Sequence, residues 1–412
     1  MSTNQNLEDK NTQKSPMKLI AILAVIVVIG IAAFFMTKGG SKTPYDKINE
    51  ASMQLQKAKT LEIKGNATIS NTVNNAKEED KEDIEKVNEM INSLAYNYEF
   101  KMDKDNSKYF GSFGYSIKDT DLININLYAD SNSFQLNVPA LSSKTLYFKW
   151  DDYDNMAEKL ELPKLHIKDY KKLLNITDYP NFKKLEKKYM DLSKKELAHK
   201  ATVSKEQVEI ELDSKKYNTK EYSFALNQEE SFNFNKKIID TIKEDKDLKE
   251  FLISKGEDFL KIARSNGDAE ILEIPKDFSF DTEENRSKMD EFITEMASNF
   301  DDIIKMTNET GVDTNVVTKY RIDEKDILRQ MVQESTSTTK VPEEGLDMTI
   351  STKSTFDIIN FNEPVTIDEL DKTNLFDLGT ATEQDFMDLK TEVQGNMMGI
   401  FMAISMMGNT MQ

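Results

Sequence analysis

The longest hydrophobic run of the chain lies near its N-terminus. Residues 19–36 carry no charged side chain. As a helix rising about 1.5 Å per residue they would reach roughly 27 Å, close to the ~30 Å hydrocarbon core of a bilayer. The alternative, a cleaved signal peptide, usually has a shorter apolar region of about 7–15 residues. The pattern therefore predicts a cytoplasmic tail over residues 1–18 and a transmembrane anchor over residues 19–37.

The positive-inside rule barely decides the orientation of this segment, because the positive charges on its two sides are nearly balanced. Lysines precede the segment and follow it in equal number: Lys10, Lys14 and Lys18 before it, and Lys38, Lys42 and Lys47 after it. A short N-terminal tail followed by a long domain favours export of the domain. We therefore expect a single-pass protein of the plasma membrane, with the bulk of the chain extracellular and a flexible linker over residues 38–44.

Beyond the linker the hydrophobic pattern changes from a helical period to alternation. Residues 45–59 place apolar side chains on one helix face, whereas residues 61–69 alternate apolar and polar positions. Alternation is clearest over residues 94–150, where short strands follow each other at intervals of about 8–12 residues with turn residues between them. This block predicts an antiparallel meander with one apolar face rich in aromatic residues.

The second half of the chain repeats the order of strands and then helices. Residues 156–200 are mainly helical in pattern, and strands resume at 208–212 and 222–226. Helices are predicted over 231–264 and 284–308, strands over 269–274, 316–322 and 346–359, and a loop over 335–342. The fold class is therefore α+β, with antiparallel sheets packed with helices. We expect two sheet and helix subdomains, 45–200 and 201–380, and a methionine-rich C-terminal helix or tail over 381–412.

The aromatic residues of the meander are the most promising candidates for a binding site. Alternation would place them together on one face, where they could line a concave apolar pocket for an acyl chain or another amphiphile. The simpler reading is that they fill an ordinary core between sheet and helices. The candidate residues are Tyr96, Tyr98, Phe100, Tyr109, Phe113, Tyr115, Phe134 and Phe148.

Two further segments leave alternatives open. The lysine-rich stretch over residues 164–200 would suit anionic lipid head groups, or it is a solvated helix face balanced by its own acidic residues. The tail over residues 396–412 is rich in methionine and repeats small residues every four positions. It would pack on the body of the protein, lie at a membrane interface, or adapt to a protein partner.

Composition and charge exclude several classes of protein. The 412 residues carry a formal net charge of −19, which argues against a general nucleic-acid binder because no positive field attracts phosphates. Cysteine is absent, so disulfides, thiolate nucleophiles and cysteine-ligated metals are excluded. No cofactor is indicated.

Candidate catalytic constellations are weak. The two histidines, His166 and His199, belong to no H-E-x-x-H motif, and no G-x-S-x-G motif offers an activated serine. Residues 103–107 begin like a calcium-binding loop, but Lys108 stands where the loop needs glycine, and Gly114 stands where it needs glutamate. This segment is predicted to be a hairpin turn, and the protein is predicted not to be an enzyme.

Three stretches carry a resemblance to known proteins. They are "TLEIKGNATIS", the meander that begins "LAYNYEFKMDKDNSKYFGSFGYSI", and "VEIELDSKKYNTKEYSFALNQEESFNFNKKIIDTI". Behind a membrane anchor, they resemble a group of clostridial and bacillar membrane-anchored proteins of unknown function. The fold expected for that group is similar to the half-barrel of bacterial lipoprotein carriers, a curved antiparallel sheet wrapping helices. The resemblance implies an apolar concavity able to hold lipid, and it assigns no individual functional residue.

Together these patterns predict a membrane-anchored, extracytoplasmic, non-enzymatic protein that binds a lipid or another apolar component of the cell envelope. The alternative is a structural or interaction protein of the envelope that docks a protein partner. An accessible cavity on the aromatic face would favour the first, and an aromatic face sealed by helices would favour the second.

Overall fold

The computed structural model describes residues 43–74, 81–117, 120–160, 162–166, 168–174, 179, 182–309, 311–341 and 346–409. This part of the chain is α+β, with one large mixed sheet packed with helices, which confirms the predicted α+β class. The anchor expected over residues 19–37 and the tail before it lie outside the described residues. Among the described helices, none is both long enough and apolar enough to cross a membrane.

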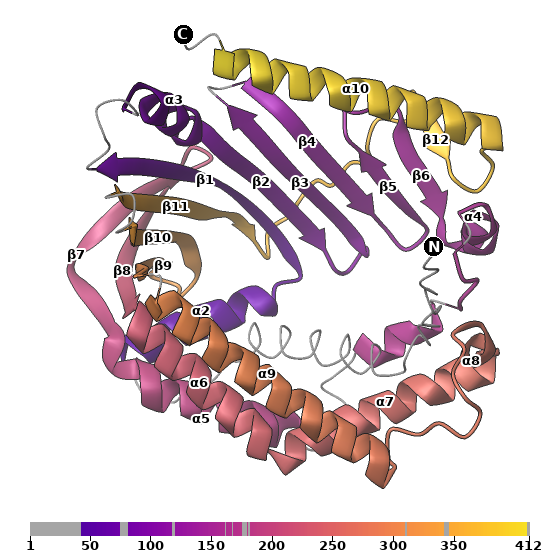
Figure 1. Ribbon diagram of the computed structural model, residues 1–412, viewed down its shortest axis with the longest axis horizontal. Helices are drawn as coiled ribbons and strands as arrows, with labels where there is room; N and C mark the ends of the chain where they lie inside the picture. The colour runs from indigo at the N-terminus through magenta and orange to yellow at the C-terminus, as the bar shows by residue number, and fades with distance from the viewer. Residues whose placement is uncertain are drawn as a thin grey trace, which may run out of the picture. The chain divides into compact units, whose positions relative to one another are not determined.

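Twelve strands form one open sheet, with β12 and β7 at its edges (Figure 1). The order is β12-β6-β5-β4-β3-β2-β1-β11-β10-β9-β8-β7, and every neighbouring pair is antiparallel except β12 with β6. The strands are β1 (Thr60–Asn74), β2 (Leu94–Asp103), β3 (Lys108–Ile117), β4 (Thr120–Ala129), β5 (Ser133–Asn137), β6 (Thr145–Lys149), β7 (Ala201–Leu212), β8 (Lys215–Asn227), β9 (Asp313–Asp323), β10 (Leu328–Val341), β11 (Leu346–Phe361) and β12 (Leu375–Asp377).

Strand β1 joins the two halves of the chain in this sheet. It pairs with β2 on one side and with β11 on the other, so that Gly65 lies between Tyr98 and Phe356. Strands from both expected subdomains therefore share one sheet, and the boundaries proposed for those subdomains stay a prediction.

The hairpin of β2 and β3 follows the predicted pattern closely. Its register runs from Leu94 opposite Ile117 to Asp103 opposite Lys108. At the turn, the Asp103 carboxylate accepts hydrogen bonds from the backbone and side-chain nitrogens of Asn106. This local bonding of an aspartate to its own turn explains why the segment is a hairpin.

Helix α2 (Pro44–Gln56) begins at a capping box and covers part of one sheet face. Thr43 and Asp46 exchange hydrogen bonds at the helix N-terminus, and Pro44 occupies the first helical position. The apolar side of α2 packs in a core with residues of β1, β2, β9, β10 and β11. The buried members are Tyr45, Ile48, Ala51, Ala58, Leu61, Met102, Ala201, Tyr320, Ile322, Leu328 and Ile358.

The chain divides into two compact units, which we name the sheet unit and the helical unit. Of the described residues, the helical unit contains 165–189 and 237–300, and the sheet unit contains the rest. The helical unit has its own core, formed around Tyr189, Leu248, Phe251 and Leu260.

The remaining helices have the following bounds: α3 (Lys81–Asn92), η1 (Trp150–Asp152), α4 (Tyr153–Lys159), η2 (Asp169–Leu174), α5 (Phe182–Leu197), η4 (Ala198–Lys200), α6 (Gln228–Glu244), α7 (Lys246–Asn266), α8 (Asp268–Ile271), α9 (Glu283–Glu309) and α10 (Glu383–Asn409). Helices α5, α6 and α9 each contribute residues to both units.

Two local predictions were wrong. Residues 269–274 are not a strand, because Gly267 ends α7 at φ 81° and the short helix α8 follows at once. Residues 335–341 are not a loop, because β10 continues to Val341 between β9 and β11. Serine and threonine side chains bond across this part of the sheet, as Ser335 and Thr352 do at 2.8 Å, and β-branched threonine fits a pleated surface well.

Candidate functional site

The aromatic residues singled out in the sequence lie on one face of strands β2–β6, which we call the aromatic face. The register places Tyr96 opposite Tyr115, Tyr98 opposite Phe113, and Phe134 opposite Phe148. Tyr109 belongs to the same face because it pairs with Met102 and Ala129. Alternation along each strand therefore brings these side chains together, as the pattern predicted.

Half of these side chains are open to solvent. The exposed fraction is 37% for Tyr96, 38% for Phe100, 40% for Tyr109 and 54% for Phe113, whereas Tyr98, Tyr115, Phe134 and Phe148 are half-buried. Ile125 of β4 faces Phe113 and is also 37% exposed, so it extends the same patch. The alternation of residues 123–127 already indicated that Ile125 shares this face, although the predicted site omitted it.

Within the described part of the sheet unit, helices α2 and α3 cover the aromatic face at the ends of its strands. At one end, the core under α2 buries Met102 and Leu61. At the other, Asn71 of β1 is buried and hydrogen-bonded to Asn88 and Asn92 of α3. The exposed aromatic side chains lie on β2 and β3 between these two covered regions.

Tyr98 is the most firmly held of the aromatic residues. Its hydroxyl donates to the backbone carbonyl of Thr355 at 2.6 Å, and its ring packs on Phe356 with centroids 4.8 Å apart. Burial raises the pKa of the Tyr98 hydroxyl well above its ordinary value, and the nearby Asp357 carboxylate raises it further. Tyr98 therefore stays a neutral donor and joins β2 to β11 across β1.

Trp150, the only tryptophan of the chain, extends the aromatic cluster beyond β6. Its ring meets Phe148 edge-on at 4.9 Å between centroids and lies 6.3 Å from Phe134. The indole nitrogen donates to the backbone carbonyl of Asp130 at 2.9 Å, which fixes the ring. Sequence alternation could not place this residue, because it lies in the short helix η1 after β6 ends.

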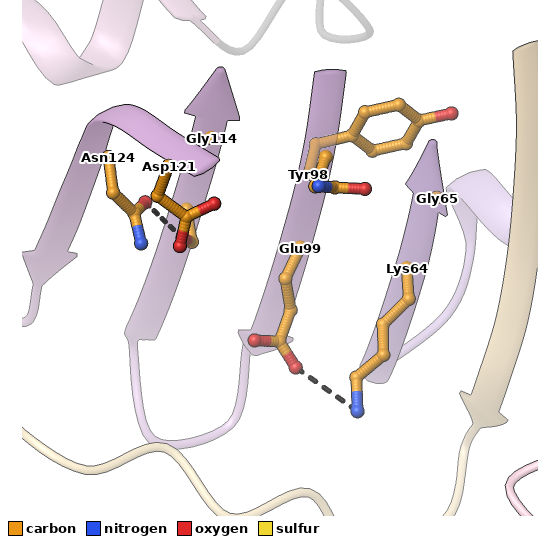
Figure 2. A pocket seen from close by; sticks show the side chains of 9 residues that line it. Lys64, Gly65, Tyr98, Glu99, Gly114, Asp121 and Asn124 are labelled. Carbon is orange, nitrogen blue, oxygen red and sulfur yellow. Dashed lines mark hydrogen bonds and ion pairs between the residues drawn. The ribbon is translucent and has the colours of Figure 1, made fainter. Parts of the chain in front are cut away.

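The opposite face of β1–β4, which we call the polar face, contains a hollow of about 320 Å³. Figure 2 shows Lys64 and Glu99 extending toward each other on one side of it, and Asp121 and Asn124 on the other side of Gly114. The lining residues are Lys64, Gly65, Asn97, Tyr98, Glu99, Ser112, Gly114, Asp121 and Asn124.

Charged and hydroxyl groups around this hollow are tied to one another. The Lys64 ammonium lies 3.5 Å from the Glu99 carboxylate. Partial burial tends to lower the pKa of Lys64, but the negative charges of Glu99 and Glu62 outweigh this effect and raise that pKa above its ordinary value. Ser112 Oγ lies 2.9 Å from Asn126 Oδ1 and 3.1 Å from Asn124 Oδ1. The hollow is thus polar, and with the carboxylate of Asp121 its lining carries one more negative than positive charge.

A third constellation lies in the helical unit and was not predicted. The fully buried carboxylate of Asp268 accepts hydrogen bonds from His166 Nδ1 and from the Tyr170 hydroxyl, each at 2.8 Å. Burial tends to raise the pKa of Asp268, but these hydrogen bonds outweigh it and hold that pKa below its usual range. The arrangement ties His166 and Tyr170 to the start of α8. Among the described residues, no group of three or more His, Cys, Asp or Glu side chains could hold a metal ion.

Several lysines of the basic stretch pair with acidic side chains. Lys184 and Lys188 of α5 reach Asp247 and Asp245 at 2.6 and 2.9 Å in the helical unit. In the sheet unit, Lys194 reaches the buried carboxylate of Asp46 at 2.7 Å. These pairs favour the reading of a balanced helix face over a lipid-binding patch.

Comparison of the chain with protein-family models, with curated proteins and with solved structures found no match.

Proposed function

We propose that the chain is a membrane-anchored, extracytoplasmic and non-enzymatic protein that binds a lipid or another apolar component of the cell envelope on its aromatic face. In this proposal residues 19–37 hold the protein in the plasma membrane and the bulk of the chain is extracellular. A half-barrel-like curvature of the sheet, similar to that of bacterial lipoprotein carriers, would enclose the bound chain.

The exposed aromatic side chains of the sheet are the observation that supports this proposal. Tyr96, Phe100, Tyr109 and Phe113 lie on the same face of β2 and β3 at diagonally neighbouring positions, and Ile125 of β4 lies directly opposite Phe113. Contiguous exposed apolar patches on soluble domains mark sites where a ligand or partner removes them from water. Burial of apolar surface contributes about 25 cal/mol per Å², so covering even part of these rings would stabilise a complex with an acyl chain.

Trp150 offers a direct test because it is the only tryptophan and borders the aromatic face. We expect a fatty acid brominated on its chain to quench the Trp150 fluorescence of the purified full chain in a saturable manner. Phe113→Ser should weaken this quenching at least about fivefold, since it removes the most exposed ring of the patch.

Ile303→Ser provides the matched control, because Ile303 of α9 is 53% exposed and lies outside the aromatic face. Quenching that is absent in the wild type, or equally strong in Phe113→Ser, would contradict the proposed site. The proposed topology has a separate test: protease added to intact cells should digest the chain beyond residue 39, and complete protection would contradict an extracellular domain.

The alternative function, docking of a protein partner, is supported by the C-terminal half of α10. Met397, Met398 and Met402 are each more than two-fifths exposed, and the space around Gly395 and Gly399 is open. Exposed methionine side chains adapt well to a partner surface. Deleting residues 397–412 separates the two functions: the amphiphile should still bind, whereas an envelope partner that uses α10 should be lost.

A further inference from the structure

The polar face carries an ordered row of amide side chains that is interrupted at one strand. Antiparallel pairing aligns Asn66 of β1, Asn97 of β2, Gly114 of β3 and Asn124 of β4 across the sheet. Neighbouring strands lie about 4.8 Å apart, so the row presents amides at a regular spacing. Glycine in the third strand leaves the gap that forms the hollow.

We propose that this hollow binds an uncharged carbohydrate, such as a glycan segment of the cell envelope. Sugar hydroxyls and N-acetyl groups both donate and accept hydrogen bonds, and the lining offers both kinds of partner in Asn97, Asn124 and Ser112. The volume of about 320 Å³ lies at the lower end of the range of roughly 300–1,000 Å³ for small-molecule sites.

The charges of the lining disfavour an anionic ligand and are compatible with an uncharged one. Lys64 and Glu99 offset each other at 3.5 Å, so an anion meets no isolated positive charge there, and Asp121 adds a carboxylate that can accept hydrogen bonds from sugar hydroxyls. The placement of Ser112 Oγ 3.1 Å from Asn124 Oδ1 orients the Asn124 amide and leaves its Nδ2 as the group that donates to a ligand. A site with fixed donors and acceptors recognises hydroxyl groups without needing a net charge.

Gly114 gives the sharpest test of this inference. A β-carbon at position 114 would meet only Asn97 atoms, at 3.8 Å, which is ordinary van der Waals contact. The β-carbon of Gly114→Val is therefore accommodated and its two methyl groups add bulk to the hollow, and valine suits a strand better than glycine does. Gly111→Ala is the matched control, because its β-carbon would meet Phe113 at 3.5 Å on the opposite face.

The experiment is isothermal titration of the full chain with two neutral oligosaccharides, tetra-N-acetylchitotetraose and maltotetraose, in a detergent without a sugar head group. The wild type and Gly111→Ala should bind at least one of them with a Kd in the range of about 10 μM to 1 mM, and Gly114→Val should bind it at least about tenfold more weakly. Absence of binding in the wild type, or equal binding by a folded Gly114→Val, would overturn the proposal. Because the aromatic face lies on the other side of the sheet, amphiphile binding should be unchanged in Gly114→Val.

Discussion

Tyr98 lies across Gly65 so closely that a β-carbon at position 65 would fall 2.3 Å from its ring (Figure 2). The same β-carbon would be 2.2 Å from the backbone oxygen of Thr355, the atom that accepts the Tyr98 hydroxyl. Neither contact can be accommodated without moving β2 or β11 away from β1. The absence of a side chain at position 65 is thus what allows Tyr98 to bridge the two halves of the sheet.

We expect Gly65→Ala to destabilise the protein by about 2–3 kcal/mol, because overpacking displaces the Tyr98 ring and strains the backbone. Tyr98→Phe should cost about 1 kcal/mol, since it removes one hydrogen bond and leaves the ring in place. Urea denaturation measures both. Gly114→Ala is the control and should be neutral or stabilising, and a loss for Gly65→Ala no larger than that of Gly114→Ala would argue against the close approach.

Asp268 predicts a specific dependence of stability on pH. Its pKa is lowered in the folded protein, so its contribution to the free energy of unfolding is complete above the ordinary aspartate value of about 3.9. That contribution is lost as the pH falls through the lower pKa of the folded state. Asp268→Asn should therefore cost about 2 kcal/mol at neutral pH and progressively less in acid, because the carboxylate no longer accepts from His166 and Tyr170.

Denaturation curves of Asp268→Asn between pH 2 and 7 would measure this effect. Asp277→Asn, at an exposed position of the same unit, should leave the curve unchanged. A difference between Asp268→Asn and the wild type that stays constant down to the lowest pH would contradict the assignment.

Helix α10 should contribute to stability only through its first half. Phe386 packs edge-on against Phe376 of β12 at 5.2 Å, and the side chains of Glu392 and Asn396 bond to the backbone of Ser143 and Leu141. Beyond these contacts the described methionine side chains are exposed. Phe386→Ala should cost about 1–2 kcal/mol, whereas deleting residues 397–412 should change the melting temperature by less than about 1 °C. A drop of several degrees for the deletion would show that the tail packs on the body.

Local elements were predictable from the sequence, but their long-range partners were not. The alternation over residues 94–117 predicted β2, β3 and their turn because side chains on a strand face opposite sides in turn. Nothing local indicates that β1 pairs with β11, about 290 residues later, because that choice depends on how whole faces fit together. Strand β10 was missed for the same reason. Its serine and threonine residues are typical of a loop, and only their pairing with β9 and β11 identifies them as a strand.

For the candidate sites too, the local pattern was predictable from the sequence, but the long-range contacts were not. The aromatic side chains could be assigned to one face, yet the sequence could not show that α2 and α3 of the sheet unit pack over the ends of its strands. The polar hollow arises from the absence of a side chain at Gly114, which becomes meaningful only when Asn97 and Asn124 are known to flank it in neighbouring strands. Asp268 is distant in sequence from His166, so the sequence could not show that their side chains form a hydrogen bond.

Native mass spectrometry of the full chain, purified from a bacterial host and followed by lipid extraction, tests the proposed binding function most directly. A lipid or other amphiphile should co-purify at a near-stoichiometric ratio, and Phe113→Ser should reduce its occupancy while Ile303→Ser does not. A clean mass without a bound amphiphile, in detergent mild enough to keep the protein folded, would contradict a lipid-binding function and favour docking of a protein partner.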